Sequence, residues 1–465
     1  MRQATHDGEK GGGSRIVRTA GEIRLRKLPK DSKYGSRGIF SINIHTSEDF
    51  DGIQVLKTWD DDLRLMKISV PRTAPHASGS DSCISLEITI WLPEDALLSD
   101  LAIESTSLTL RVFEDIDLKV ARHSEFVSLS GDVYFPDPGK EDADPRTSYP
   151  LDSRHITVET ASGDIRGIYP LYDYLKLGSQ SGSIKVGVYP QPVLPSAPAP
   201  ADLEVSTSSG DILVNLPTLV PHYMPPARDY VTHVFTASGE VSGAYFLGSI
   251  GSFKTSSGDI TAKILPVIQA SPSTDPDDAP QTQFDTWTMS GDHDLLVLDP
   301  VFVSLLPSDE GVEPVLPTTP NGAGQPDGRY RNESPYEDIG DKNPYRDILP
   351  PTLNEDAILE NQGSSKMVKR QRAASKAWRT LTATHHSVSA AVTVQYPNSW
   401  EGTVSEKSTS GDVKVEGKEL KIISYKKGWT YRELVARKGV SRKGEGSWVS
   451  MDVISGDVKF VVGDA

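Results

Sequence analysis

Apolar and polar residues alternate along most of this chain, and the alternation repeatedly breaks at a serine-glycine pair and resumes with its parity shifted by one residue. In one copy, the side chains predicted to face inward are Val205, Thr207 and Ser209 before the break, and Ile212 and Val214 after it. Alternation fixes the face on which each side chain of a strand lies, so a shift in parity cannot occur within one flat strand. The pattern therefore predicts short strands joined at a corner or bulge that redirects the chain.

The corner contains Ser-Gly in nine copies, and an acidic residue follows the glycine in eight of them. The glycines, which we predict to be structural turn residues, are Gly131, Gly163, Gly182, Gly210, Gly239, Gly258, Gly291, Gly411 and Gly456. Glycine suits such a turn because it reaches positive φ without a Cβ clash. Successive serines are 19 residues apart in the shortest units, such as Ser162 to Ser181. Weaker copies around Gly21 and Ser107 lack part of the motif and are predicted to be degenerate repeats.

Repeats this short predict an all-β fold. We favour a β-solenoid-like stack of short repeats, in which each repeat adds one rung. The alternative is a β-sandwich or propeller, in which the two strands of each repeat pair as a hairpin around Ser-Gly. Propeller blades need about 40 to 45 residues, and Thr and Ser before the turn suit stacked side-chain ladders. Both observations favour the solenoid.

Composition divides the chain into four parts. Residues 1–14 form a polar tail that is predicted to be disordered, and residues 15–306 carry the alternating pattern almost without interruption. Residues 307–384 are rich in Pro, Asn, Asp and Gly and have little periodicity, which predicts a long disordered insertion with a short basic helix near its end. The alternation returns in residues 385–465, which either complete the same solenoid or form a small β-domain.

Charge and cysteine content narrow the possible partners. The formal net charge of −16 argues against nucleic acid, because binding to phosphates requires a basic surface. The single cysteine, Cys83, excludes an intrachain disulfide and a cysteine-based zinc cluster, and its place in an alternating run predicts a buried thiol. The sequence has neither a signal-peptide pattern nor an apolar stretch long enough to span a membrane. Membrane association would therefore require an anchor upstream of this chain, and the localisation stays open.

The acids after the turn glycines are the recurring polar groups that could form a site. They are Asp132, Asp164, Asp211, Glu240, Asp259, Asp292, Asp412 and Asp457. In stacked repeats these carboxylates would lie about 5 Å apart, so their repulsion has to be offset. Either each carboxylate accepts backbone N–H groups at its own turn, or the acids bind Ca²⁺ as a ladder. We favour the first interpretation and predict no metal site, because calcium-binding repeats supply several acids per turn.

Motifs for catalysis or cofactor binding are missing: HExxH, GxSxG, CxxC and GxGxxG do not occur. The adjacent residues His385 and His386 could bind a metal ion, but no third ligand is evident, and an exposed strand start is the favoured interpretation. His293 stands where other repeats carry Ile or Val and is predicted to be an inward-facing substitution. The sequence therefore predicts no catalytic residues and no cofactor.

The run [ST]-x-S-G-D-[IV] occurs at residues 160–165, 207–212, 255–260 and 408–413. It resembles the adhesin-like domain family of unknown function, which has bacterial and fungal members. The resemblance covers roughly residues 16–298 and 385–462. It implies an all-β repeat domain, often exposed at the cell surface or tethered to a membrane, with no established enzymatic activity and no catalytic residues to carry over.

Our leading hypothesis is a non-enzymatic β-repeat protein that offers an elongated binding surface to a protein or glycan ligand, in adhesion or in contact with a cell envelope. One alternative is a carbohydrate-acting enzyme, which would need two converging acids and aromatic side chains such as Trp287 or Tyr245 in a concave groove. Another alternative is an intracellular scaffold that recruits partners through the disordered insertion.

Overall fold

The computed structural model describes residues 15–34, 38–46, 56–60, 65–70, 73–74, 82–94, 96–116, 118–136, 151–218, 223–269, 281–303, 381–439 and 446–463. These residues form strands and no helix, so the predicted all-β class is confirmed. The predicted tail lies outside the described residues. So does the predicted insertion up to residue 380, including the basic helix that was predicted near its end.

Two sheets built mainly from parallel strands contain most of the strands. The larger has 16 strands, which in spatial order are β2 (Ile39–Thr46), β6 (Ser82–Leu92), β1 (Arg15–Lys27), β8 (Thr109–Val112), β10 (Val133–Tyr134), β12 (Ile165–Leu171), β14 (Ile184–Pro190), β16 (Ile212–Asn215), β18 (Val241–Leu247), β20 (Ile260–Gln269), β22 (His293–Val297), β25 (Val392–Tyr396), β31 (Val458–Val462) and β27 (Val413–Gly417), with β5 (Thr73–Ala74) beside β1 and β23 (Val301–Val303) beside β20.

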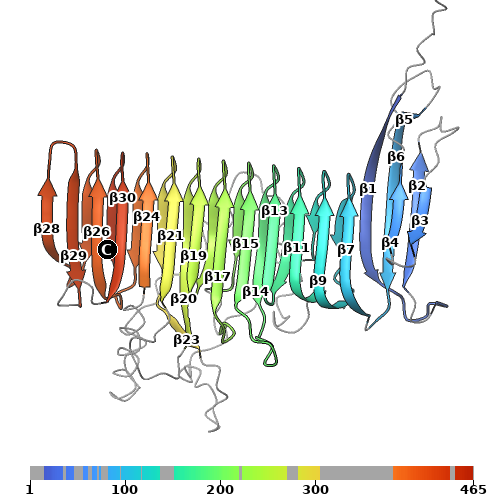
Figure 1. The fold of residues 1–465 in the computed structure, drawn as a ribbon, viewed down its shortest axis with the longest axis horizontal. Helices are drawn as coiled ribbons and strands as arrows, with labels where there is room; N and C mark the ends of the chain where they lie inside the picture. Colours follow the sequence, from blue (N-terminus) through green and yellow to red (C-terminus); the bar gives the residue numbers. More distant parts are fainter. Residues whose placement is uncertain are drawn as a thin grey trace, which may run out of the picture.

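The smaller sheet has 13 strands, which in spatial order are β28 (Lys421–Lys427), β29 (Arg432–Lys438), β26 (Gly402–Ser408), β30 (Ser447–Val453), β24 (Leu381–Ser387), β21 (Thr282–Thr288), β19 (Ile250–Thr255), β17 (Tyr230–Thr236), β15 (Ala201–Thr207), β13 (Tyr174–Ser179), β11 (Leu151–Thr160), β9 (Leu118–Ser128) and β7 (Leu97–Ser105). A separate antiparallel pair consists of β3 (Leu56–Asp60) and β4 (Leu65–Ser69). Figure 1 shows the strands side by side in one long row, with β1 and β6 near one end and β28 at the other.

The chain alternates between the two sheets from β7 to β25, apart from β23, so each repeat adds one strand to each sheet. The strands before and after a Ser-Gly turn therefore lie in different sheets. This placement excludes the hairpin arrangement, in which the two strands of a repeat would pair with each other. Each strand instead pairs in parallel with its equivalent in the next repeat; for example, Val205 of β15 lies beside Val234 of β17.

Burial around each turn explains how the chain changes sheets. Val205 and Thr207 are buried as predicted, but Ser209 is exposed and Gly210 takes the buried position. The parity therefore shifts across two consecutive exposed residues, Ser208 and Ser209, and not at the glycine itself. Two outward residues in a row turn the chain from one sheet to the other while both strands keep their apolar sides inward.

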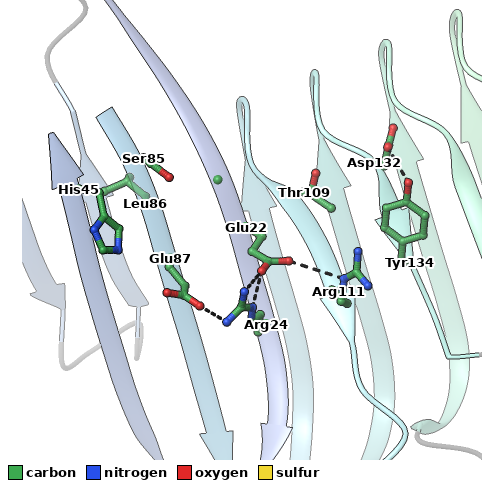
Figure 2. Close-up of a pocket in the computed structure, with 11 residues that line it drawn as sticks. Glu22, Arg24, His45, Ser85, Leu86, Glu87, Thr109, Arg111, Asp132 and Tyr134 are labelled. Carbon is green, nitrogen blue, oxygen red and sulfur yellow. Dashed lines mark hydrogen bonds and ion pairs between the residues drawn. The ribbon is translucent and has the colours of Figure 1, made fainter. Parts of the chain in front are cut away.

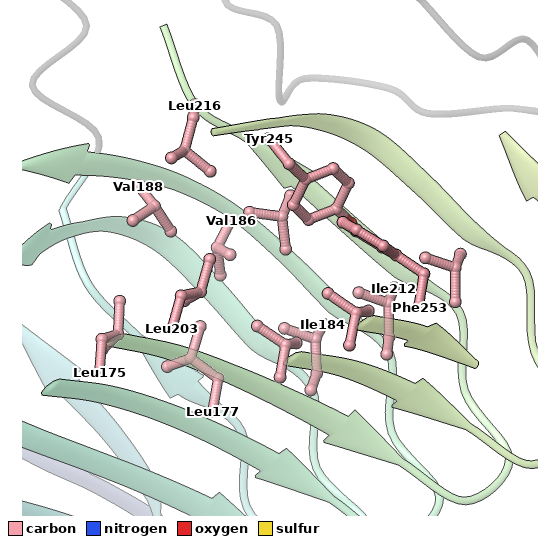
Figure 3. Close-up of a cluster of buried hydrophobic side chains, with 14 of the residues drawn as sticks. Leu175, Leu177, Ile184, Val186, Val188, Leu203, Ile212, Leu216, Tyr245 and Phe253 are labelled. Atoms are coloured by element: carbon pink, nitrogen blue, oxygen red, sulfur yellow. The ribbon is translucent and has the colours of Figure 1, made fainter. Parts of the chain in front are cut away.

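One continuous apolar core lies between the inward faces of the two sheets. In Figure 3, Leu177 and Leu203 project from the smaller sheet toward Ile184 and Ile212 of the larger one. All four side chains are at most 1% exposed. Burying a side chain of this size stabilises a fold by about 1.5 to 3 kcal/mol, and each repeat adds several of them to the core.

The last repeats do not stack in the order of the sequence. β30 lies between β24 and β26, and β31 lies between β25 and β27, parallel to both neighbours. The chain thus leaves one position open after residues 381–396, forms β26 and β27 beyond it, turns back through the antiparallel hairpin β28–β29, and fills the open position with its C-terminal residues. These strands extend both sheets of the main stack, and residues 381–384, which the sequence assigned to the insertion, belong to β24.

The two degenerate repeats have different outcomes. The one around Ser107 is confirmed, because β7 and β8 lie in different sheets. The one around Gly21 is wrong, because β1 is a single strand that pairs with β6 from Val17 to Lys27 without a corner. A turn without glycine, from Ser387 to Val392, connects β24 with β25 and was not predicted from the sequence.

Candidate functional site

The turn glycines form a column in which each backbone lies against the turn of a neighbouring repeat. A Cβ added at Gly182 would lie 1.9 Å from the carbonyl oxygen of Gly163, and one added at Gly239 would lie 1.9 Å from the carbonyl oxygen of Gly210. None of the nine has φ in the left-handed region, so the predicted reason for glycine, a positive φ, is wrong. Glycine is required here because the turns stack too closely to admit a Cβ.

In eight of the nine copies a Thr or Ser stands two residues before the serine, and its hydroxyl can link one turn to its neighbour; Val453 takes this position in the last copy. Thr207 donates through Oγ1 to the carbonyl oxygen of Gly182 (3.1 Å) and accepts the N–H of Gly210 (3.2 Å). Thr236 makes the same pair of bonds one repeat further, to Gly210 (3.2 Å) and from Gly239 (3.1 Å). These bonds explain why Thr or Ser occupies this buried position of the motif.

The acids after the glycines also join successive turns. Oδ1 of Asp132 accepts the backbone N–H of Asp164 at 2.8 Å, and Oδ1 of Asp164 accepts the N–H of Ser183 at 2.8 Å. Asp259 binds the N–H of Asp292 in the same way, at 2.8 Å. The carboxylates therefore accept N–H bonds as the structural interpretation requires, but from the next repeat and not from their own turn.

These bonds offset the repulsion between neighbouring carboxylates, because a backbone N–H is a strong partner for an anionic oxygen.

Among the residues that the structure describes, no group of three or more His, Cys, Asp and Glu side chains is arranged to hold a metal ion.

Two histidines, His293 of β22 and His385 of β24, are buried in the core. His385 is fully buried and His386 half-buried, so the predicted exposed strand start is wrong. The reason is that β24 begins at Leu381, four residues earlier, which places His385 in mid-strand on the inward face. His293 is buried, as predicted.

Oγ1 of Thr286 lies 3.1 Å from Nδ1 of His293 and 2.8 Å from Nδ1 of His385. A hydroxyl carries one proton, so one ring accepts it and the other ring donates its own Nδ1–H to the oxygen. Burial lowers the pKa of His293 to about 4 and that of His385 to about 3. Both rings are therefore neutral at neutral pH.

Thr286 and His385 belong to an inward column of the smaller sheet that changes from apolar to polar along the stack. In spatial order the column reads Val158, Leu177, Val205, Val234, Phe253, Thr286, His385, Met451 and Glu406. Burial, opposed in part by the backbone N–H groups of Lys414 and Phe460, raises the pKa of Glu406 to about 9. The carboxyl group is therefore protonated at neutral pH.

A polar pocket lies on the outer face of the larger sheet, near its N-terminal end. Figure 2 shows the side chains that line it, which come from β1, β2, β6, β8 and the segment around β10. The strand register places Glu22 of β1 beside Glu87 of β6. Arg24 of β1 lies beside Arg111 of β8, and Arg111 lies beside Tyr134 of β10. We call this set the Arg24 pocket.

The side chains of the Arg24 pocket form one connected network. Arg24 makes ion pairs with both Glu22 and Glu87, and Nε of Arg111 lies 3.6 Å from Oε2 of Glu22. The Arg111 guanidinium lies over the Tyr134 ring, 4.9 Å from its centroid. The Tyr134 hydroxyl donates to Oδ2 of Asp132 at 2.9 Å.

Burial and this hydrogen bond raise the pKa of Tyr134. The phenol is therefore a hydrogen-bond donor at neutral pH. The pocket thus presents guanidinium donors, carboxylate acceptors and an aromatic ring on one face of the sheet. No sequence pattern predicted this pocket, because its residues come from strands that are separated by long stretches of chain.

The network limits what the two adjacent carboxylates can do. Glu22 and Glu87 lie on neighbouring strands, as a pair of catalytic acids would, but the same guanidinium binds both of them. A general acid must be within reach of the group that it protonates, whereas both of these carboxylates face one guanidinium. The arrangement therefore suits binding better than acid catalysis.

Other candidates from the sequence do not lie in this pocket. Tyr245 is fully buried, with its hydroxyl donating to the carbonyl oxygen of Ser242 at 2.9 Å, and Trp287 is half-buried on β21 of the other sheet. Neither of them lines the pocket. Cys83 is exposed, so the predicted buried thiol is wrong; the neighbouring residues Ile84 and Leu86 take the inward positions of β6.

Comparison of the chain with family models, curated proteins and solved structures found no match in any of the three. The described part of the chain contains no helix with the length and apolar character needed to cross a membrane.

Proposed function

We propose that this protein is a β-solenoid that acts without catalysis, as an elongated binding protein in adhesion or cell-envelope contact. The regular alternation between two parallel sheets supports the solenoid, because each repeat then forms one rung of a rigid stack. A stack of this kind carries outward side chains in rows that run across the strands, with neighbours in a row about 4.8 Å apart. Such rows can contact an extended ligand at many points.

The observation that carries the proposal is the pairing of two outward rows that pass through the Arg24 pocket and continue onto β12. One row runs through Arg24, Arg111, Tyr134 and Arg166, and the neighbouring row contains Glu87, Glu22, Asp132 and Asp164. Donors and acceptors thus alternate over several strands beside an aromatic ring. A glycan fits this chemistry, since its hydroxyl groups both donate and accept hydrogen bonds and its ring faces pack on aromatic side chains.

The test is binding of the purified protein to immobilised neutral polysaccharides, with affinities measured by calorimetry. Arg111→Ala removes the contacts with Glu22 and Tyr134 together and should weaken binding by at least about tenfold, since a hydrogen bond to a charged group contributes roughly 1.5 to 3 kcal/mol. Arg122→Ala is the matched control, because Arg122 is an exposed arginine on β9 of the opposite sheet.

Equal loss of binding in both variants, or no binding by the unaltered protein, would refute the glycan proposal. Release of new reducing ends during incubation would favour the carbohydrate-acting enzyme instead. Because Arg24 holds both neighbouring carboxylates, we expect no such release.

A further inference from the structure

The hairpin β28–β29 extends the smaller sheet past the end of the larger one. The larger sheet ends at β27, which packs against β29. Ile422 and Tyr425 lie opposite the buried residues Ala436 and Leu434 across the hairpin, and so share their inward face. They are nevertheless 58% and 52% exposed. The inward apolar face of the smaller sheet therefore continues onto β28, past the last strand of the larger sheet.

The tip of the same hairpin projects a tryptophan into solvent. The N–H of Gly428 donates to the carbonyl oxygen of Tyr431 at 2.8 Å and closes the turn around Trp429. Trp429 has the full exposure of a free side chain, 105%, and Ile423 and Tyr431 are about half exposed. Five exposed apolar side chains thus lie within ten residues of chain on one hairpin, and we call this set the Trp429 patch: Ile422, Ile423, Tyr425, Trp429 and Tyr431. Patches of this kind mark interaction surfaces.

The hairpin is basic although the whole chain is acidic. Residues 413–439 contain eight Lys and Arg against three Glu, whereas the formal net charge of the chain is −16. Lys421, Lys426 and Lys427 are exposed on β28 itself, next to the Trp429 patch. This contrast concentrates positive charge at one end of the stack, beside apolar and aromatic side chains.

The chemistry of the patch favours a lipid surface over a second copy of the chain. Strand β28 carries three lysines and a register shift between Ile422 and Ser424, and both features protect a sheet edge from pairing with another strand. Two such basic hairpins would also repel each other. Tryptophan and tyrosine settle at the level of lipid headgroups, and lysines near the surface are attracted to anionic lipids.

We propose that the hairpin β28–β29 docks on an anionic lipid surface, with Trp429 at headgroup depth and the lysines of β28 against lipid phosphates. In Figure 1 this hairpin stands at the opposite end of the stack from β1 and β6, which contribute to the Arg24 pocket. Docking at the hairpin therefore leaves the Arg24 pocket free, and the two sites are independent of each other.

The experiment is co-sedimentation of the full chain with vesicles of phosphatidylcholine alone and of phosphatidylcholine mixed with phosphatidylserine. We expect binding to the mixed vesicles that declines as salt is added, because ions screen the attraction. Reversing two charges with Lys426→Glu and Lys427→Glu should weaken binding by at least about tenfold. Trp429→Ala should weaken it severalfold and abolish any blue shift of the tryptophan emission.

Matched controls come from the middle of the stack, where exposed Phe235 and Lys254 lie side by side on β17 and β19. Phe235→Ala and Lys254→Glu should bind as the unaltered protein does. Equal binding to both kinds of vesicle, or unchanged binding by the Trp429 and lysine variants at unchanged thermal midpoints, overturns the proposal. Light scattering could instead show a dimer that Trp429→Ala converts to a monomer, which would assign the patch to a second copy of the chain. Binding of poly-glutamate without binding of vesicles would assign the patch to an acidic protein. Either result also overturns the lipid proposal.

Discussion

At the residue scale, the repeat motif is explained by contacts between turns and not by the conformation of a single turn. A Cβ at position 182 would meet the backbone of the turn around Gly163, whereas one at position 178 would meet only side-chain atoms, the nearest at 3.7 Å. The two glycines lie four residues apart in the same repeat. They therefore separate the effect of close stacking from the general effect of removing a glycine.

We expect Gly182→Ala to lower the free energy of unfolding by about 1 to 3 kcal/mol, the usual cost of overpacking. Gly178→Ala should be neutral or slightly stabilising, because alanine restricts the unfolded chain. Urea unfolding of both variants measures the difference. Similar midpoints for the two variants would mean that the turns separate easily, and the stacking explanation would fail.

Glu406 provides a pH-dependent prediction at the same scale. Its folded-state pKa of about 9 lies above the ordinary value of 4.5, so unfolding releases a proton between these pH values. The stabilisation that this raised pKa of Glu406 contributes is therefore present below about pH 4.5 and is lost as the pH rises toward 9. Glu406→Gln removes this loss, and should raise the free energy of unfolding at pH 8 by at least about 1 kcal/mol.

The same substitution should have almost no effect at about pH 3, where Glu406 is protonated in both states. His293 and His385 act in the opposite direction: their pKa values are lowered from 6.5 to about 4 and about 3, so stability falls as the pH drops below 6.5. That effect is common to both proteins and cancels in the comparison. A stabilisation that is equal at the two pH values would show that the ionisation of Glu406 is not its cause.

At the scale of elements, the sequence predicted strands and turns well and their spatial order poorly. Alternation and the Ser-Gly spacing identify β15, β16 and their equivalents, because burial requires a fixed parity in each repeat. The position of β30 between β24 and β26 was not predictable, because all the repeats offer the same inward pattern and the motif does not encode which neighbour a strand chooses. The Arg24 pocket was missed for a related reason, since outward residues follow no pattern that burial would impose.

The insertion of the C-terminal repeat predicts a specific effect of truncation. A chain that ends at residue 445 lacks β30, which separates β24 from β26, and β31, which separates β25 from β27. Strand β26 then loses its parallel neighbour, so we expect the amides of β26 and β29 to exchange rapidly with deuterium. A chain that ends at residue 400 is the control, because its remaining strands from β7 to β25 stack in sequence order; their protection should match that in the chain ending at 445. Slow exchange in β26 after the first truncation would contradict the observed order.

At the scale of the whole molecule, the stack continues across a long segment that separates two of its repeats in sequence. β24 pairs directly with β21 from Leu381 opposite Thr282, and β25 pairs with β22, although the residues between β23 and β24 number more than seventy. Loop closure adds only about 0.6 kcal/mol for each doubling of loop length. A long connection at this place therefore costs little.

The small cost of closing this loop predicts that much of the connection can be deleted. Replacing residues 307–362 with a short Gly-Ser linker should leave the thermal midpoint unchanged, because the register between β21 and β24 is set by residues outside the segment, and the segment itself is rich in Pro, Asn, Asp and Gly. Limited proteolysis of the full chain should cut first within the same segment. The measurement that decides is hydrogen exchange in β24: if the deletion accelerates exchange there, the segment contributes to the stack and is not merely a connection.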